Sequence, residues 1–246
     1  ELNELGDRFI AGAISNGCPE KEAKKIWDKM NAFSSYSFNK SHAVAYTYLS
    51  AKTAWLSYYY PSIFMKATLN SFIDNNDKIK YYIAVCKEKG IEVLSPNVNK
   101  SQEQFAVDYS VSANTKKAPI RFGLKGIKSL GAKSKLVIAE REANGEFTSI
   151  YDFIKRVDVK CTNKRTLEGL IKSGAFSTIE KSRKQLMDNI EYIVATASKE
   201  AKQKEMGQVS LFAGTEDAPK FELQGSDEEF SSKEIQLFEK EFLGFY

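Results

Sequence analysis

The stretch that decides the fold is residues 127–131, Ile-Lys-Ser-Leu-Gly, followed by apolar positions at helical spacing over 132–143. A tight turn that carries a small residue, an apolar residue and a glycine before a helix is typical of a helix-hairpin-helix. Such a turn exposes backbone N–H groups beside a helix N-terminus, and these groups attract anions. The stretch therefore predicts a phosphate site made by Lys128, Ser129, Gly131, Lys133 and Lys135.

A second copy of this pattern follows, with a helix over 163–172 and a turn at 173–176, Ser-Gly-Ala-Phe. Two hairpins can hold both strands of a duplex through phosphate contacts that carry no base information. Ser129 in the first turn, and Lys172 or Ser173 in the second, depart from the Gly-x-Gly ideal, and either turn alone could be a helix stop with solvated lysines. Together they predict further DNA-binding residues: Lys164, Arg165, Lys172 and Gly174.

Apolar periodicity predicts a mainly α-helical chain with a small β insert. Helices are expected over 2–15, 19–33, 41–60, 61–71, 77–89, 132–143, 149–157, 163–172 and 182–204. Short strands are expected at 91–94, 104–109 and 120–122. Beyond Met206 the composition becomes rich in Gly, Asp and Glu, which is typical of a linker, apart from an apolar stripe over 235–245.

The 246 residues include 42% hydrophobic ones, enough to bury a core, which excludes disorder throughout. The net charge of +4 is too small to diagnose a nucleic-acid binder, but its distribution is uneven. Residues 1–125 carry 17 basic and 12 acidic groups, 126–185 carry 13 and 7, and 186–246 carry 6 and 13. Two basic segments therefore precede an acidic one.

The three cysteines are widely spaced without a Cys-x-x-Cys pair, so neither a disulfide framework nor a thiolate zinc site is expected. A reducing, cytoplasmic setting fits best. Neither a membrane span nor a secretion signal is recognisable. Because the chain opens on Glu1 and stops at Tyr246, we interpret it as an internal piece of a longer protein.

Residues 38–43, Phe-Asn-Lys-Ser-His-Ala, open the helix expected at 41–60. Asn39 or Ser41 can cap this helix, and Lys40 and His42 stand at its N-terminus, where the helix dipole favours a negative ligand. His42 is the single histidine of the chain. A lone histidine beside a lysine is most often structural or merely exposed, so the residues alone leave an anion role open.

The same segment belongs to a series of motifs that follow one another along the chain at 37–43, 45–46, 53–56, 60–65, 93–99, 120–124, 150–153, 163–165 and 241–246. In this order they resemble the bacterial replicative DNA polymerase III alpha subunits, a family of C-family polymerases, beginning within the fingers. The resemblance covers essentially the whole chain. It implies a part of a DNA-directed DNA polymerase that works with primed duplex DNA, deoxynucleoside triphosphates, a sliding clamp and other replisome subunits.

The resemblance also assigns residues. Lys40 and His42 would face the incoming triphosphate, with Asn39 and Ser41 orienting their helix, and the hairpins would hold the duplex behind the active site. Residues 208–212, Gln-Val-Ser-Leu-Phe, match the family's clamp-binding peptide, in which Gln208, Leu211 and Phe212 would dock on the sliding clamp. From the residues alone, a tail that tucks two apolar side chains onto its own domain is as good an interpretation.

One part of the family pattern is missing. The acidic side chains that hold two Mg²⁺ ions in such polymerases lie in the palm, N-terminal to the fingers, so the Mg²⁺ ligands are expected outside this chain. Asp74 and Asp77 fit helix capping better, and residues 227–229 lie in the linker. We therefore expect no catalytic or metal-binding residue here and an inactive isolated fragment.

The sequence thus predicts three parts: fingers with a strand insert over 1–119, a tandem helix-hairpin-helix domain over 120–185, and a helix with an acidic, clamp-binding linker over 186–246. The alternative is a non-enzymatic, sequence-independent DNA-binding module that carries the same hairpins.

Overall fold

The computed structural model describes residues 2–34, 39–111, 116–206 and 221–244. The chain divides into two compact units, Glu1–Leu56 and Ser57–Tyr246. Helices dominate both units and a small sheet lies in the second, which confirms the predicted fold class.

The first unit contains α1 (Leu2–Ser15), α2 (Glu20–Ser34) and most of α3 (Lys40–Tyr59). The helices α1 and α2 pack together through Phe9 and Trp27, whose ring centroids lie 5.6 Å apart. Gly6 lies directly under the Trp27 indole, where a Cβ atom would approach Nε1 to 2.7 Å. Gly17 adopts a φ of +86° after α1, so the Asn-Gly pair ends this helix as predicted.

The second unit begins with α4 (Pro61–Ser71) and α5 (Asn76–Glu88), which pack side by side. A three-stranded sheet follows, made by β1 (Val93–Leu94), β2 (Ala106–Val107) and β3 (Ile120–Arg121). The central strand β3 runs parallel to β1 and antiparallel to β2, with Ile120 opposite Val93 and Val107. The strands are shorter than predicted, because only two residues of β1 and two of β2 pair with β3.

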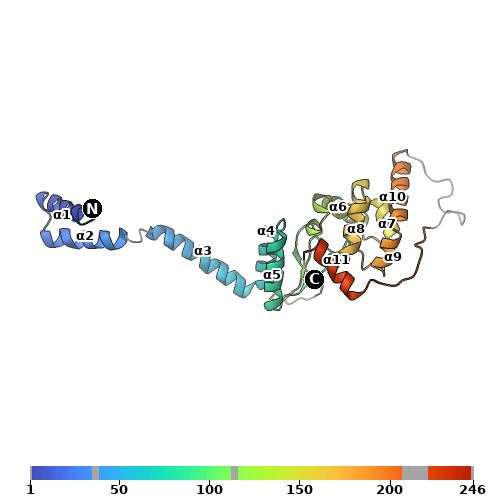
Figure 1. Cartoon of the computed structure of the whole chain (residues 1–246), viewed down its shortest axis with the longest axis horizontal. Coiled ribbons are helices and arrows are strands. Elements are labelled where there is room, and N and C mark those ends of the chain that lie inside the picture. The colour runs from blue at the N-terminus through green and yellow to red at the C-terminus, as the bar shows by residue number, and fades with distance from the viewer. Residues whose placement is uncertain (1, 35–38, 112–115, 207–220, 245–246) are drawn as a thin grey trace. The chain divides into compact units, whose positions relative to one another are not determined.

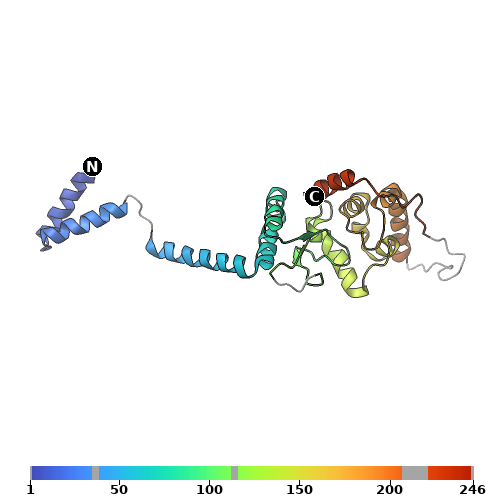
Figure 2. The ribbon, with the colours of Figure 1, turned by 90° about the horizontal axis from the view of Figure 1, so that it is seen from below.

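The hairpin region and the C-terminal part follow the sheet. Their elements are η1 (Leu124–Gly126), η2 (Gly131–Lys133), α6 (Ser134–Asn144), α7 (Ile150–Arg156), η3 (Val159–Cys161), α8 (Lys164–Lys172), α9 (Arg183–Asp188), α10 (Ile190–Glu205) and α11 (Ser232–Phe242). The last helix, α11, lies against α8 (Figures 1 and 2).

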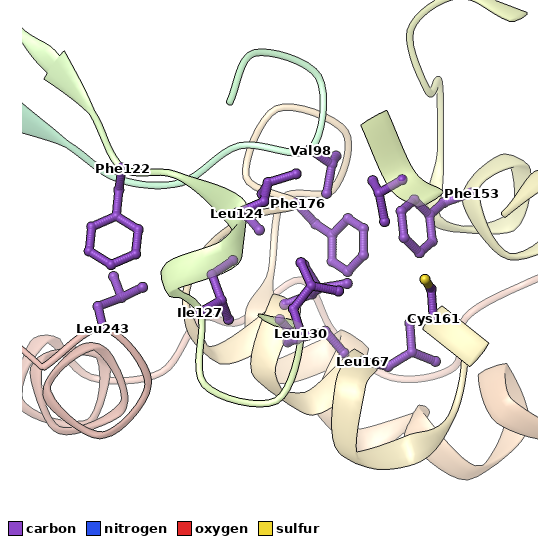
Figure 3. Close-up of a cluster of buried hydrophobic side chains, with 14 of the residues drawn as sticks. Val98, Phe122, Leu124, Ile127, Leu130, Phe153, Cys161, Leu167, Phe176 and Leu243 are labelled. Atoms are coloured by element: carbon purple, nitrogen blue, oxygen red, sulfur yellow. The ribbon is translucent and has the colours of Figure 1, made fainter. Parts of the chain in front are cut away.

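One hydrophobic core joins the sheet and the hairpins. Figure 3 shows Phe122 next to Leu243 at one end, and Phe153 and Phe176 at the other, where their rings meet edge to face at 5.0 Å. The domain boundaries expected at 119/120 and 185/186 therefore both fall inside the second unit. The residue pattern changes at both positions, but buried side chains on either side of each position pack into the same core.

The long helix expected over 182–204 is broken at Asn189 into α9 and α10. The Asn189 side chain donates to the carbonyl of Gln224 at 2.8 Å and accepts from the Gln224 N–H at 3.0 Å. Phe221 stacks between Tyr151 and Tyr192, with ring centroids 5.0 and 5.2 Å away. Residues 221–230, expected to be part of a linker, thus follow a defined path along the hairpin region.

Candidate nucleic-acid interface

The first turn presents free backbone donors. Lys128 N–H donates to the carbonyl of Phe242 in α11 at 3.1 Å, and the N–H groups of Leu130 and Lys133 are used inside the turn. Within the described residues, the N–H groups of Ser129, Gly131 and Ala132 have no acceptor. Three backbone donors without an acceptor in one turn are the kind of arrangement that attracts anions, and the phosphate site expected at this turn stays a prediction.

Ser129, the small residue of the first turn, has an unusual backbone conformation. Ser129 adopts a φ of +97°, in the region that favours glycine. Its hydroxyl is buried without a hydrogen-bond partner, and it faces Gly169 of α8, where an added Cβ would overlap it. The first turn therefore sits directly on α8.

The second hairpin lies between α7 and α8, in residues 157–163. Asn163 caps α8, because its side-chain oxygen accepts from the Thr166 N–H at 3.1 Å. The N–H groups of Lys164 and Arg165 have no acceptor among the described residues. The N-terminus of α8 therefore supplies the second set of free donors.

This placement corrects the turn expected at 173–176. There the N–H groups of Gly174 and Ala175 donate to the carbonyls of Ile171 and Leu170, and Gly174 has a φ of +77°. This is a Schellman helix stop, and the carbonyl end of a helix does not attract phosphate. Arg183 covers Gly174, and the Lys172 ammonium lies over the rings of Phe238 and Phe242 in α11.

Polar contacts brace the two hairpins against each other. The Lys133 ammonium donates to the Thr166 hydroxyl at 2.9 Å. The Cys161 thiol donates to the Lys133 carbonyl at 3.6 Å, and burial raises the pKa of this thiol to about 11, so it stays protonated. Because Cys161 and Thr166 belong to the second hairpin, the spacing of the two sets of donors is held by the fold.

A hollow with several cations opens at this junction. It brings together five of the residues expected to bind DNA: Lys128, Ser129, Gly131 and Lys133 of the first hairpin and Arg165 of the second. Lys135 points elsewhere and lies 3.8 Å from the Glu103 carboxylate. Lys164 pairs with Glu191, and this hydrogen bond raises the pKa of Lys164.

Sequence reasoning missed three contributors to this site. Lys125 lines the hollow from η1, and Asp74 lines it from the connection between α4 and α5. Thr166 accepts a hydrogen bond from the Lys133 ammonium and so fixes its position. The spacing Asn163-x-x-Thr166 is a capping signal that could have indicated Thr166. Asp74 is far away in sequence, so only the fold brings it here.

In the first unit, Asn39 caps α3. Its side-chain oxygen accepts from the Ser41 N–H at 3.0 Å and from the Ser41 hydroxyl at 2.6 Å, which selects Asn39 over Ser41 as the cap. Lys40 and His42 are exposed in the first turn, and the His42 ring lies 4.3 Å from the Tyr46 ring. A lysine and a histidine thus lie in the first turn of α3.

Other predicted features cannot be placed in the same way. Gln208, Leu211 and Phe212 lie outside the described residues. Among the side chains that the structure describes, no group of three or more His, Cys, Asp or Glu could hold a metal ion. No helix in the described part of the chain is both long and apolar enough to span a membrane.

The two braced hairpins define a helix-hairpin-helix module, and residues 90–186 match the family described as "Helix-hairpin-helix motif". Over its whole length the chain is 42% identical to a DNA polymerase III subunit alpha from Borreliella burgdorferi, and 37% identical to those from Thermus aquaticus and Neisseria meningitidis serogroup B. It spans 21%, 19% and 21% of these three relatives. Over its whole length the chain is therefore similar to DNA polymerase III alpha subunits, and it spans about a fifth of the length of these relatives.

Proposed function

We propose that the tandem hairpins bind the sugar-phosphate backbone of duplex DNA without reading its sequence. The observation that supports this best is the set of five free N–H groups in two braced hairpins, with Lys128 and Arg165 beside them. Backbone N–H groups and cations recognise phosphates but carry no base specificity. A duplex presents phosphates on both strands, which suits two donor sets at a fixed spacing.

Binding of short duplexes to the chain tests this proposal. Lys128→Ala with Arg165→Ala should weaken binding equally on unrelated sequences and lower the salt slope by about one per lost phosphate contact. Lys199→Ala with Lys202→Ala, on α10, removes the same charge and is the matched control. Losses that depend on sequence, or equal losses in the control, would contradict a phosphate grip at the hairpins.

For the complete protein we propose template-directed DNA synthesis from deoxynucleoside triphosphates. The supporting observation is the similarity to DNA polymerase III alpha subunits over all of this chain. Mg²⁺ would be held by acidic residues outside this chain, so the isolated 246 residues should not extend a primer. Extension by the isolated chain would contradict this. Failure of the complete subunit to extend would favour the alternative, a DNA-binding module without enzymatic activity.

Lys40 and His42 are proposed to hold the triphosphate, with Asn39 and Ser41 ordering the first turn of α3. In support, the helix dipole at the capped N-terminus of α3 and the exposed Lys40 beside it both favour binding of a polyphosphate. In the complete subunit, Lys40→Ala with His42→Ala should raise the KM for nucleotide and lower kcat, because the phosphates carry the charge of the transition state. Lys52→Ala, further along α3, is the charge-matched control.

The last proposal concerns the sliding clamp. Gln208, Leu211 and Phe212 would bind it as an extended peptide, with the two apolar side chains in a groove and the glutamine at its rim. Leu211→Ala with Phe212→Ala should abolish retention on the clamp and leave synthesis on short primers unchanged. Loss of both activities would indicate that the two residues instead support the fold.

A further inference from the structure

One wall of the hollow at the first hairpin does not come from the hairpins. Asp74 lines it from the α4–α5 connection, Asn76 from the start of α5, and Lys125 from η1. Neither the hairpin pattern nor the phosphate grip proposed above assigns a role to Asp74 or Lys125.

Asp74 and Lys125 form an ion pair at the rim. The Lys125 ammonium lies 3.7 Å from the Asp74 carboxylate, whose side chain is 84% exposed, whereas that of Lys125 is only 29% exposed. The lysine is thus held against the hollow while the carboxylate faces solvent. An exposed pair with this separation is weak, so a stronger anion can displace Asp74.

We propose that Lys125 is a further phosphate-binding residue and that Asp74 competes with DNA for it. The proposal rests on the duplex binding proposed above. A phosphate seated on the N–H groups of Ser129, Gly131 and Ala132 enters a hollow that Lys125 and Lys128 also line. Before binding, Asp74 neutralises Lys125. After binding, the phosphate does so, and Asp74 is left as a nearby like charge.

The consequence is a grip weakened by the protein's own carboxylate. A single negative charge about 6 Å from a phosphate at the surface changes binding by about threefold. Such a residue lowers affinity equally for every sequence and leaves the hairpins intact. Weaker phosphate contacts dissociate faster, which would let a duplex move along the hairpins more easily.

The test is duplex binding by Asp74→Asn at several salt concentrations. Affinity should rise about three- to fivefold on unrelated sequences, and the salt slope should become steeper by up to about one because Lys125 is free to replace a counterion. Asp77→Asn removes the same charge three residues away, outside the hollow, and should change affinity less. Lys125→Met should weaken binding, and in that background Asp74→Asn should keep only the gain of about threefold from removing a like charge, without the steeper salt slope.

The outcomes separate the two proposals. If Lys128→Ala with Arg165→Ala weakens binding but Asp74→Asn and Asp77→Asn behave alike, the competition is refuted and the hairpin grip stands. If Asp74→Asn steepens the salt slope equally in the Lys125→Met background, Lys125 is not the shared partner. If the hairpin variants themselves bind normally, duplex binding at this site is wrong.

Discussion

Replacing Ser129 by glycine should stabilise the second unit. Ser129 has a φ of +97°, and its hydroxyl is buried without a hydrogen-bond partner. Glycine adopts this backbone conformation without the steric penalty of a Cβ, and it has no hydroxyl to desolvate. The two costs that the serine carries would both disappear.

The size of the effect follows from these terms. A non-glycine residue in the left-handed region costs about 1–2 kcal/mol, and a buried unpaired hydroxyl costs about 1–3 kcal/mol. Against this, glycine loses about 0.5–1 kcal/mol more backbone entropy on folding. The contact of the serine side chain with Gly169 is lost as well. A net gain of about 1–2 kcal/mol remains, which raises Tm by about 4 °C in a domain of this size.

Thermal unfolding and urea titration of Ser129→Gly and Ser129→Ala measure the two terms separately. The alanine variant removes only the hydroxyl and keeps the strained Cβ, so it should gain less than the glycine variant. Gly131→Ala is the reverse control, because its φ is +52° and a Cβ there would meet nothing within 4 Å, so it should lose about 1 kcal/mol. A lower Tm for Ser129→Gly would refute this account of the turn.

Three further changes test the packing around the site. Arg141→Met should cost about 3 kcal/mol by urea titration, because the buried guanidinium donates to the carbonyls of Val98 and Ser101 at 2.9 and 2.8 Å. Burial raises the pKa of Glu180 in the folded protein, so this residue destabilises the fold progressively as the pH rises above 4.5, the usual pKa of a glutamate. Glu180→Gln should therefore make Tm depend less steeply on pH in this range. Phe221→Ala should speed hydrogen exchange at the Gln224 amide, because Tyr151 and Tyr192 lose their stacking partner.

Local patterns predicted much of the fold. The helices at 2–15 and 61–71 were predicted with their observed bounds, since Gly17 and Pro61 act through the backbone of their own residues. Helix α11 begins and ends three residues before the expected apolar stripe, and Ser231 and Glu234 form its capping box. The break at Asn189 was missed because its cause, Gln224, is distant in sequence.

The first hairpin was predicted from its residues and the second only in part. Lys164 and Arg165 lie in the first turn of α8, and their DNA-binding role stays a prediction, whereas Lys172 and Gly174 were placed in a turn whose N–H groups the helix already uses. A glycine after a helix occurs both in hairpins and in helix stops. The direction of the neighbouring backbone donors distinguishes them, and the residue pattern does not show it.

The sequence by itself determined the mainly helical class, the tight first turn and the similarity to DNA polymerase III alpha subunits, because these depend on residue types at short spacings. Only the tertiary structure decided that the sheet and hairpins share one core, that Thr166 and Cys161 brace the hairpins through Lys133, and that Asp74 faces Lys125. These contacts join residues far apart in the chain, and burial and distance select them only after the chain has folded.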